Sequence, residues 1–119
     1  MGISTSAIVR SETQGSRAVQ FFSTDAVAAA VTVFNFGFVP DIVRFVNLTD
    51  RIQDEWFAGV PADYALHTIA AGTVTYVTTG GITVSAARNA AGTVNEGDIS
   101  IPAALMVASK DFAIIAETV

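Results

Sequence analysis

Residues 42–57 read Ile-Val-Arg-Phe-Val-Asn-Leu-Thr-Asp-Arg-Ile-Gln-Asp-Glu-Trp-Phe, and this stretch decides the fold class. In its first half both sets of alternate side chains include apolar residues, a pattern typical of a strand that is covered on both faces. Leu48, Thr49 and Asp50 then predict a turn. In the second half Ile52 and Trp56 alternate with polar side chains, as expected of a half-buried antiparallel strand. The stretch therefore predicts two adjacent strands.

A second pair of strands is expected around two consecutive glycines. Residues 73–79 and 82–86 are rich in β-branched side chains and flank Gly80 and Gly81. Tight two-residue turns between antiparallel strands need positive φ angles, which glycine adopts without steric cost. We therefore expect a β-hairpin that turns at the glycine pair.

The rest of the chain adds short apolar stretches separated by turn signals. We expect strands at about residues 29–36, 98–101 and 110–117, the last of them inside the sheet, while residues 64–66 could form a turn of helix. No long helical period is present. The pattern predicts an all-β fold, a small antiparallel β-sandwich or barrel of about six to eight strands.

The N-terminal segment differs in character from the rest. Residues 1–20 are polar, rich in serine and threonine, and without a clear period. We expect an extended N-terminal arm with no core of its own, followed by a single β domain over residues 21–119. Such an arm is either disordered or ordered only against a neighbouring subunit. It lacks the basic start and apolar stretch of a secretory leader.

Charged residues are scarce in this chain. They make up 14% of the 119 residues, and 51% are hydrophobic, whereas an ordinary soluble domain is about 25% charged. The deficit indicates either a surface of small side chains or a surface covered by other protein subunits. The longest apolar runs have six residues, far short of the roughly 20 that span a bilayer, so we expect no membrane partner.

Charge and cysteine content exclude further classes of protein. A net charge of −5 argues against nucleic acid as a partner, because phosphate binding requires lysine and arginine. The absence of cysteine excludes disulfides, thiol catalysis and cysteine-ligated metals. Stability must therefore come from packing.

Residues that could carry catalysis are few. His67 is the only histidine, and Asp63 lies four residues before it. A Ser-His-Asp system would also need a serine in a strained strand-to-helix elbow, which the sequence does not contain. We therefore expect His67 to be structural.

The densest acidic cluster contains Asp50, Asp54 and Glu55. Paired carboxylates perform glycoside chemistry, but Asp54 and Glu55 would point to opposite faces of a strand. Ion pairs with Arg44 and Arg51 explain the cluster more simply. A calcium site at Asp50 and Asp54 would lack the spaced Asp/Asn/Gly pattern of a calcium loop. We expect no enzyme, and we assign no catalytic, cofactor-binding or metal-binding residue.

Five aromatic residues are the remaining candidates for function. They are expected to lie at subunit interfaces, where large aromatic side chains contribute most of the buried area: Phe21, Phe22, Trp56, Phe57 and Tyr64. An aromatic platform for sugars, built from Trp56, Phe57 and Tyr64, is the alternative.

Residues 38–59 resemble a group of small structural proteins of tailed bacteriophages. The shared features are a Gly-Phe-x-Pro opening at residues 37–40, an Asn-x-Thr-Asp-Arg motif at residues 47–51, and an aromatic pair followed by Gly59. The group also has a Gly-Gly-Ile-Thr-Val segment, matched at residues 80–84, and a late Ile-Pro-Ala, matched at residues 101–103. The resemblance covers most of residues 34–119.

This resemblance implies a virion component, and small all-β proteins of this size are often capsid decoration or cement proteins. The expected partners are the major capsid protein and further copies of the chain, with a homotrimer favoured. The expected location is the capsid surface, after synthesis in the host cytoplasm. A tail or head-fibre component that binds a host surface, and a small carbohydrate-binding or hydrolytic module, are the alternatives.

Overall fold

Alternation of buried and exposed side chains accounts for most of the strands. The computed structural model describes residues 3–11, 16–27, 30–85 and 96–118, with side chains from residue 16 onward. In residues 42–47, Val43, Phe45 and Asn47 are buried while their neighbours are only partly covered. The described residues form nine strands: β1 (Ile3–Ser11), β2 (Arg17–Thr24), β3 (Thr32–Phe34), β4 (Ile42–Asn47), β5 (Ile52–Phe57), β6 (Tyr64–Thr68), β7 (Val74–Val84), β8 (Ile99–Ile101) and β9 (Asp111–Glu117).

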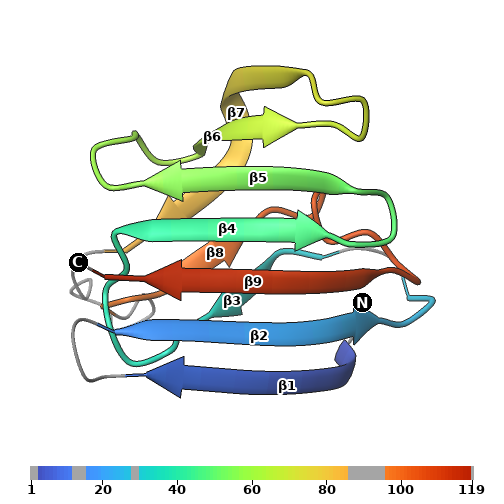
Figure 1. The fold of residues 1–119 in the computed structure, drawn as a ribbon, viewed down its shortest axis with the longest axis horizontal. Coiled ribbons are helices and arrows are strands. Elements are labelled where there is room, and N and C mark those ends of the chain that lie inside the picture. Colours follow the sequence, from blue (N-terminus) through green and yellow to red (C-terminus); the bar gives the residue numbers. More distant parts are fainter. Residues whose placement is uncertain (1–2, 12–15, 28–29, 86–95, 119) are drawn as a thin grey trace.

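The strands form one antiparallel sheet that curls over to make two layers. Its order is β1-β2-β9-β4-β5-β6-β7-β8-β3. Strand β7 belongs to both layers, because its first half pairs with β6 and its last two residues pair with β8. In Figure 1, β8 and β3 lie behind the front strands. The all-β class is confirmed, and the terminal strand β9 lies between β2 and β4 inside the sheet, as expected.

The core fills the space between the two layers. Four phenylalanine rings form its centre, with Phe22 lying 5.3 Å from Phe112 beside it and 5.3 Å from Phe34 of the back layer. Phe45 lies 5.1 Å from Phe112 between ring centroids. Separations of this size are typical of favourable aromatic pairs. The two layers are therefore held together mainly by β2, β4 and β9 in front and by β3 and β8 behind.

The expected glycine hairpin is wrong. Residues 74–84 form one strand, and Gly80 and Gly81 lie where it passes between the layers. Ala65 pairs with Val77 and Tyr64 with Ile82, so the intervening residues of β7 bulge out of the ladder. A Cβ on Gly81 would lie 2.5 Å from the backbone carbon of Tyr64. Glycine is thus needed for a close backbone approach rather than for a reversal of the chain.

The N-terminal segment also differs from the expected arm. Residues 3–11 form β1, and the boundary expected at residue 20 falls inside β2, which pairs with β9. Within β2, Ala18 is fully buried and Gln20 is buried beside it. The polar composition hid this strand, because alternate positions from residue 18 to residue 24 face the core, among them the polar Gln20 and Thr24, while Val19, Phe21 and Ser23 face outward.

Two shorter predictions need correction. Residues 64–66 belong to strand β6 and not to a turn of helix, because β6 lies between β5 and β7 in the sheet. Of the strand expected at residues 29–36, residue 29 lies outside the described residues, and residues 30–36 contain only β3, three residues that pair with β8. Across the described ranges, no helix has the length and apolar character needed to cross a bilayer.

Candidate functional site

The front layer has an outer face that the described residues leave exposed or partly exposed. Side chains on this face belong to β2, β9, β4, β5, β6 and the first half of β7, and they alternate with the core residues of the same strands. Ten of them are apolar, and all ten are exposed or partly exposed: Val19, Phe21, Ile42, Val46, Phe57, Leu66, Val74, Tyr76, Ala113 and Ile115. We call this surface the outer face.

Strand pairing places these side chains in rows across the sheet. Phe21 is paired with Ala113, and Ala113 with Val46. In the next row Val19 is paired with Ile115. Beyond β5, the rings of Tyr64 and Tyr76 lie 5.6 Å apart and extend the apolar surface. The apolar positions therefore form one group over β2, β9 and β4 and another over β6 and β7. Between them β5 presents Gln53 and Glu55 as well as Phe57, which is paired with Ile42.

The charges on the outer face balance one another. Arg44 lies near its centre and donates from Nε to Glu55 Oε2 at 2.6 Å, while its Nη1 lies 3.4 Å from Glu117 Oε1. The hydrogen bond to Glu55 raises the pKa of Arg44. With Arg17 and Asp111, the face carries two arginines and three carboxylates. Most of the net charge of −5 therefore lies elsewhere.

The size of the outer face is close to that of a protein–protein interface. Six strands about 4.8 Å apart, with about six residues each at about 3.4 Å per residue, span roughly 29 Å by 20 Å, or about 600 Å² in projection. A standard interface buries about 800 Å² on each partner. Exposed apolar patches of more than a few hundred Å² mark interaction sites. The outer face is thus the strongest candidate for binding another protein.

The five aromatic residues predicted at interfaces separate into two groups. Phe21 and Phe57 are 38% and 41% exposed on the outer face, and Tyr64 is half-buried there. Phe22 is fully buried in the core, and Trp56 is buried with its indole Nε1 donating to the Val60 carbonyl at 3.1 Å. The predictions for Phe22 and Trp56 are therefore corrected. Adjacent residues of a strand point to opposite faces, and in each aromatic pair the neighbour, Phe21 or Phe57, takes the outward position.

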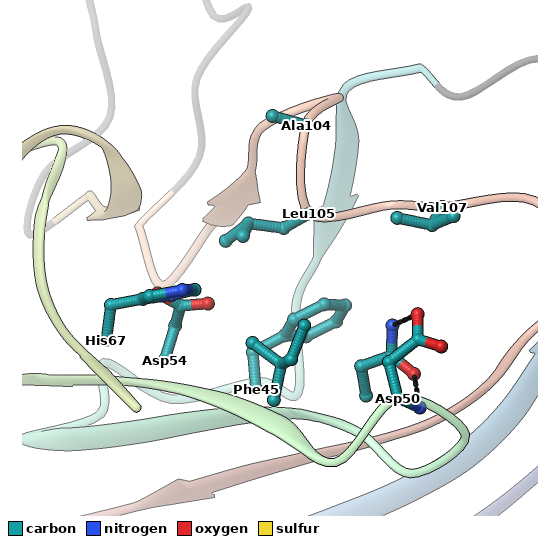
Figure 2. A pocket seen from close by; sticks show the side chains of 9 residues that line it. Phe45, Asp50, Asp54, His67, Ala104, Leu105 and Val107 are labelled. Carbon is teal, nitrogen blue, oxygen red and sulfur yellow. Dashed lines mark hydrogen bonds and ion pairs between the residues drawn. The ribbon is translucent and has the colours of Figure 1, made fainter. Parts of the chain in front are cut away.

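A small cavity with polar ends lies on the inner side of the same sheet. Its volume is about 110 Å³, and it opens between the front layer and the segment after β8. Figure 2 shows Phe45 on one wall and Leu105 opposite, with Asp54 and His67 at one end and Asp50 at the other. The remaining lining residues are Asn47, Ile52, Ala104 and Val107.

One end of the cavity is formed by a histidine–aspartate pair in which the aspartate is buried and the histidine partly exposed. Asp54 of β5 and His67 of β6 are direct cross-strand partners, and His67 Nδ1 lies 2.8 Å from Asp54 Oδ1. Asp54 is only 2% exposed. Burial raises the pKa of its carboxyl group, and the hydrogen bond with His67 offsets part of this rise. Asp63, the partner considered from the sequence, instead accepts hydrogen bonds from Gly80 and Gly81.

The geometry does not assemble the glycoside chemistry considered from the sequence. Asp54 faces the cavity, whereas Glu55 lies on the outer face with Arg44. No serine or threonine lines the cavity. In the portion of the chain that the structure describes, no group of three or more histidine and acidic side chains is placed to hold a metal ion.

Sequence reasoning missed the Asp54–His67 contact, although a signal was present. Asp54 is in phase with Ile52 and Trp56, the residues expected to face inward. A carboxylate at such a position requires a polar partner nearby. The partner's identity depends on the register between β5 and β6, which local patterns do not encode.

Comparisons with known proteins identify no relative. No family model matches the chain, and neither a curated protein nor a solved structure is significantly similar to it. The likeness to phage structural proteins therefore remains a hypothesis, and function must be argued from the surfaces of the molecule itself.

Proposed function

We propose that this protein is a non-enzymatic structural component of a bacteriophage virion, which decorates and stabilises the capsid by binding through its outer face. The observation that carries the proposal is the outer face of the front layer, whose ten exposed or partly exposed apolar side chains lie on both sides of a group of paired charges. An antiparallel sheet with one face in water normally has polar side chains on that face. Strand β4 instead has the apolar pattern of a strand covered twice, and the chain supplies one of the two covering layers.

The proposed partner for the outer face is the major capsid protein. A capsid presents the same site many times, so that a small protein with modest affinity per contact is held firmly once several copies act together. Further copies of the chain are the second partner, as a closed oligomer for which a trimer is favoured. The phage-like motifs of residues 38–59 support the same assignment.

The position of the aromatic residues favours attachment over recognition of a host glycan. A sugar platform uses exposed, flat aromatic faces, and Trp56 is buried in the core. Phe21 and Phe57, which are exposed, lie within the apolar outer face rather than in loops. A fibre component or a carbohydrate-binding module therefore has less support than a decoration protein.

Substitution of exposed aromatics on the outer face tests the proposal. We expect Phe57→Ser or Phe21→Ser to weaken co-sedimentation with empty capsid shells by about tenfold or more, as for an interface residue worth 1–2 kcal/mol. The matched control is Val33→Ser, which removes an apolar side chain that is 55% exposed on the back layer. Circular dichroism should show all three variants folded.

Two results would count against the proposal. Equal binding by the Phe57 and Val33 variants would remove the outer face from the attachment. Failure of the unsubstituted protein to bind any shell, in a folded state, would remove the capsid as partner.

A further inference from the structure

We propose that the cavity between the front layer and residues 104–107 binds a primary alkylammonium group with a short apolar chain. This inference concerns the inner side of the sheet and does not depend on the capsid proposal. It rests on the contrast between the two ends of the cavity, on the apolar wall between them, and on the cavity's volume.

Two carboxylates at opposite ends of the cavity have different partners. Asp50 lines one end, and Lys110 Nζ lies 3.1 Å from its Oδ1 while the amide of Asn47 donates to its Oδ2 at 3.0 Å. Asp54 lines the other end and is more deeply buried, with His67 as its partner. Among the described residues, no lysine or arginine forms an ion pair with Asp54. The described residues thus supply an ammonium group at the Asp50 end and a histidine, but no ammonium group, at the Asp54 end.

The wall of the cavity between these two ends is apolar. Phe45 and Ile52 from the sheet and Leu105 from the opposite segment line the space. Such side chains favour the methylene groups of a ligand over its polar groups. A ligand with one cationic end and a hydrocarbon body matches both surfaces, whereas an anion would face two carboxylates.

The volume of the cavity limits the length of the ligand's alkyl chain. A cavity of about 110 Å³ is somewhat smaller than an engineered cavity of about 150 Å³ that accepts benzene. Four carbons and one nitrogen therefore suit the space. Two sources present this group, a free small amine and the end of a lysine side chain on another protein.

A titration with n-butylammonium, followed by NMR of the backbone amides, tests the inference. We expect shifts at Phe45, Asp54, His67 and Leu105 and a dissociation constant in the millimolar range. The neutral analogue n-butanol should bind about tenfold more weakly, because it lacks the charge-assisted hydrogen bond to the carboxylate. A parallel titration with Nα-acetyl-lysine amide separates the sources: binding tighter than that of n-butylammonium assigns a lysine side chain, and binding of n-butylammonium alone assigns a free amine.

Variants of the chain make the test decisive. Asp54→Asn should weaken n-butylammonium binding about tenfold, while Glu96→Gln, which removes the same charge from an exposed residue outside the cavity lining, should leave it unchanged. Ala104→Leu, at an exposed lining position, should reduce binding by filling the space without burying a new polar group. Binding of n-butanol as strong as that of n-butylammonium, or unchanged binding by a folded Asp54→Asn protein, would overturn the inference.

Discussion

At the scale of single residues, Asp54 stands out because it is the one buried charged side chain among the described residues. Burial raises the pKa of its carboxyl group above the ordinary value of 3.8, in spite of the hydrogen bond with His67. The folded state therefore binds a proton more tightly than the unfolded state does. The resulting contribution to stability is absent at high pH, grows as the pH falls through the raised pKa, and is complete below 3.8.

This sign predicts how a variant without the carboxylate behaves. We expect the free energy of unfolding of the original protein, relative to Asp54→Asn, to increase as the pH is lowered from 7 toward 4, because only the original protein gains a proton at this site. Urea unfolding at several pH values measures the difference. Glu96→Gln serves as the control, because its side chain is exposed, and a difference that shrank on acidification would contradict the assigned direction.

At the scale of secondary structure elements, the glycine pair in β7 is the most specific feature. We expect Gly81→Ala to destabilise the protein by about 3 kcal/mol, the upper part of the range for a forced contact, because the new methyl group would lie 2.5 Å from backbone atoms of Tyr64. Gly80 has a φ of 72° and nothing within 4 Å of its ideal Cβ. Gly80→Ala should therefore cost only the left-handed backbone strain, about 1 kcal/mol. Equal losses in chemical unfolding would refute the close-approach explanation.

The strands at the N-terminus give a second prediction at this scale. Strand β1 lies at the edge of the sheet, whereas β2 pairs with β9 along residues 17–23. We expect deletion of residues 1–11 to leave a folded protein, and deletion of residues 1–20 to abolish cooperative unfolding, because it removes Ala18 and Gln20 from the core. Thermal unfolding followed by circular dichroism distinguishes the two truncations, and a stable fold without residues 1–20 would restore the flexible-arm interpretation.

At the scale of the whole molecule, local sequence patterns predicted those strands whose conformation depends on residues close in the sequence. The alternation in residues 42–57 indicated β4 and β5, and the apolar run after residue 110 indicated β9 inside the sheet. The hairpin at Gly80 and the arm at residues 1–20 were wrong, because their conformations depend on contacts with Tyr64 and β9 that lie far away in the sequence. The Asp54–His67 pair was missed for the same reason, because it depends on the register between two strands, which local patterns do not determine.

The outer face is also the surface on which a partner is expected at this scale. Ten apolar side chains lie on it, and Arg44 is paired there with both Glu55 and Glu117. A partner that covered this face would gain from apolar burial without leaving these charges unpaired. The scarcity of charge in the chain is not confined to this face, since the exposed Val27, Val31 and Val33 lie elsewhere.

The most direct test of the outer face as the attachment surface uses the absence of cysteine from the chain. Single substitutions Val74→Cys and Val33→Cys place one thiol on the outer face and one on the back layer, at valines that are 58% and 55% exposed. Maleimide labelling is then compared for the free protein and for the protein bound to capsid shells. We predict that binding protects the thiol at position 74 and leaves that at position 33 reactive. A reactive thiol at position 74 in the bound protein would contradict the account.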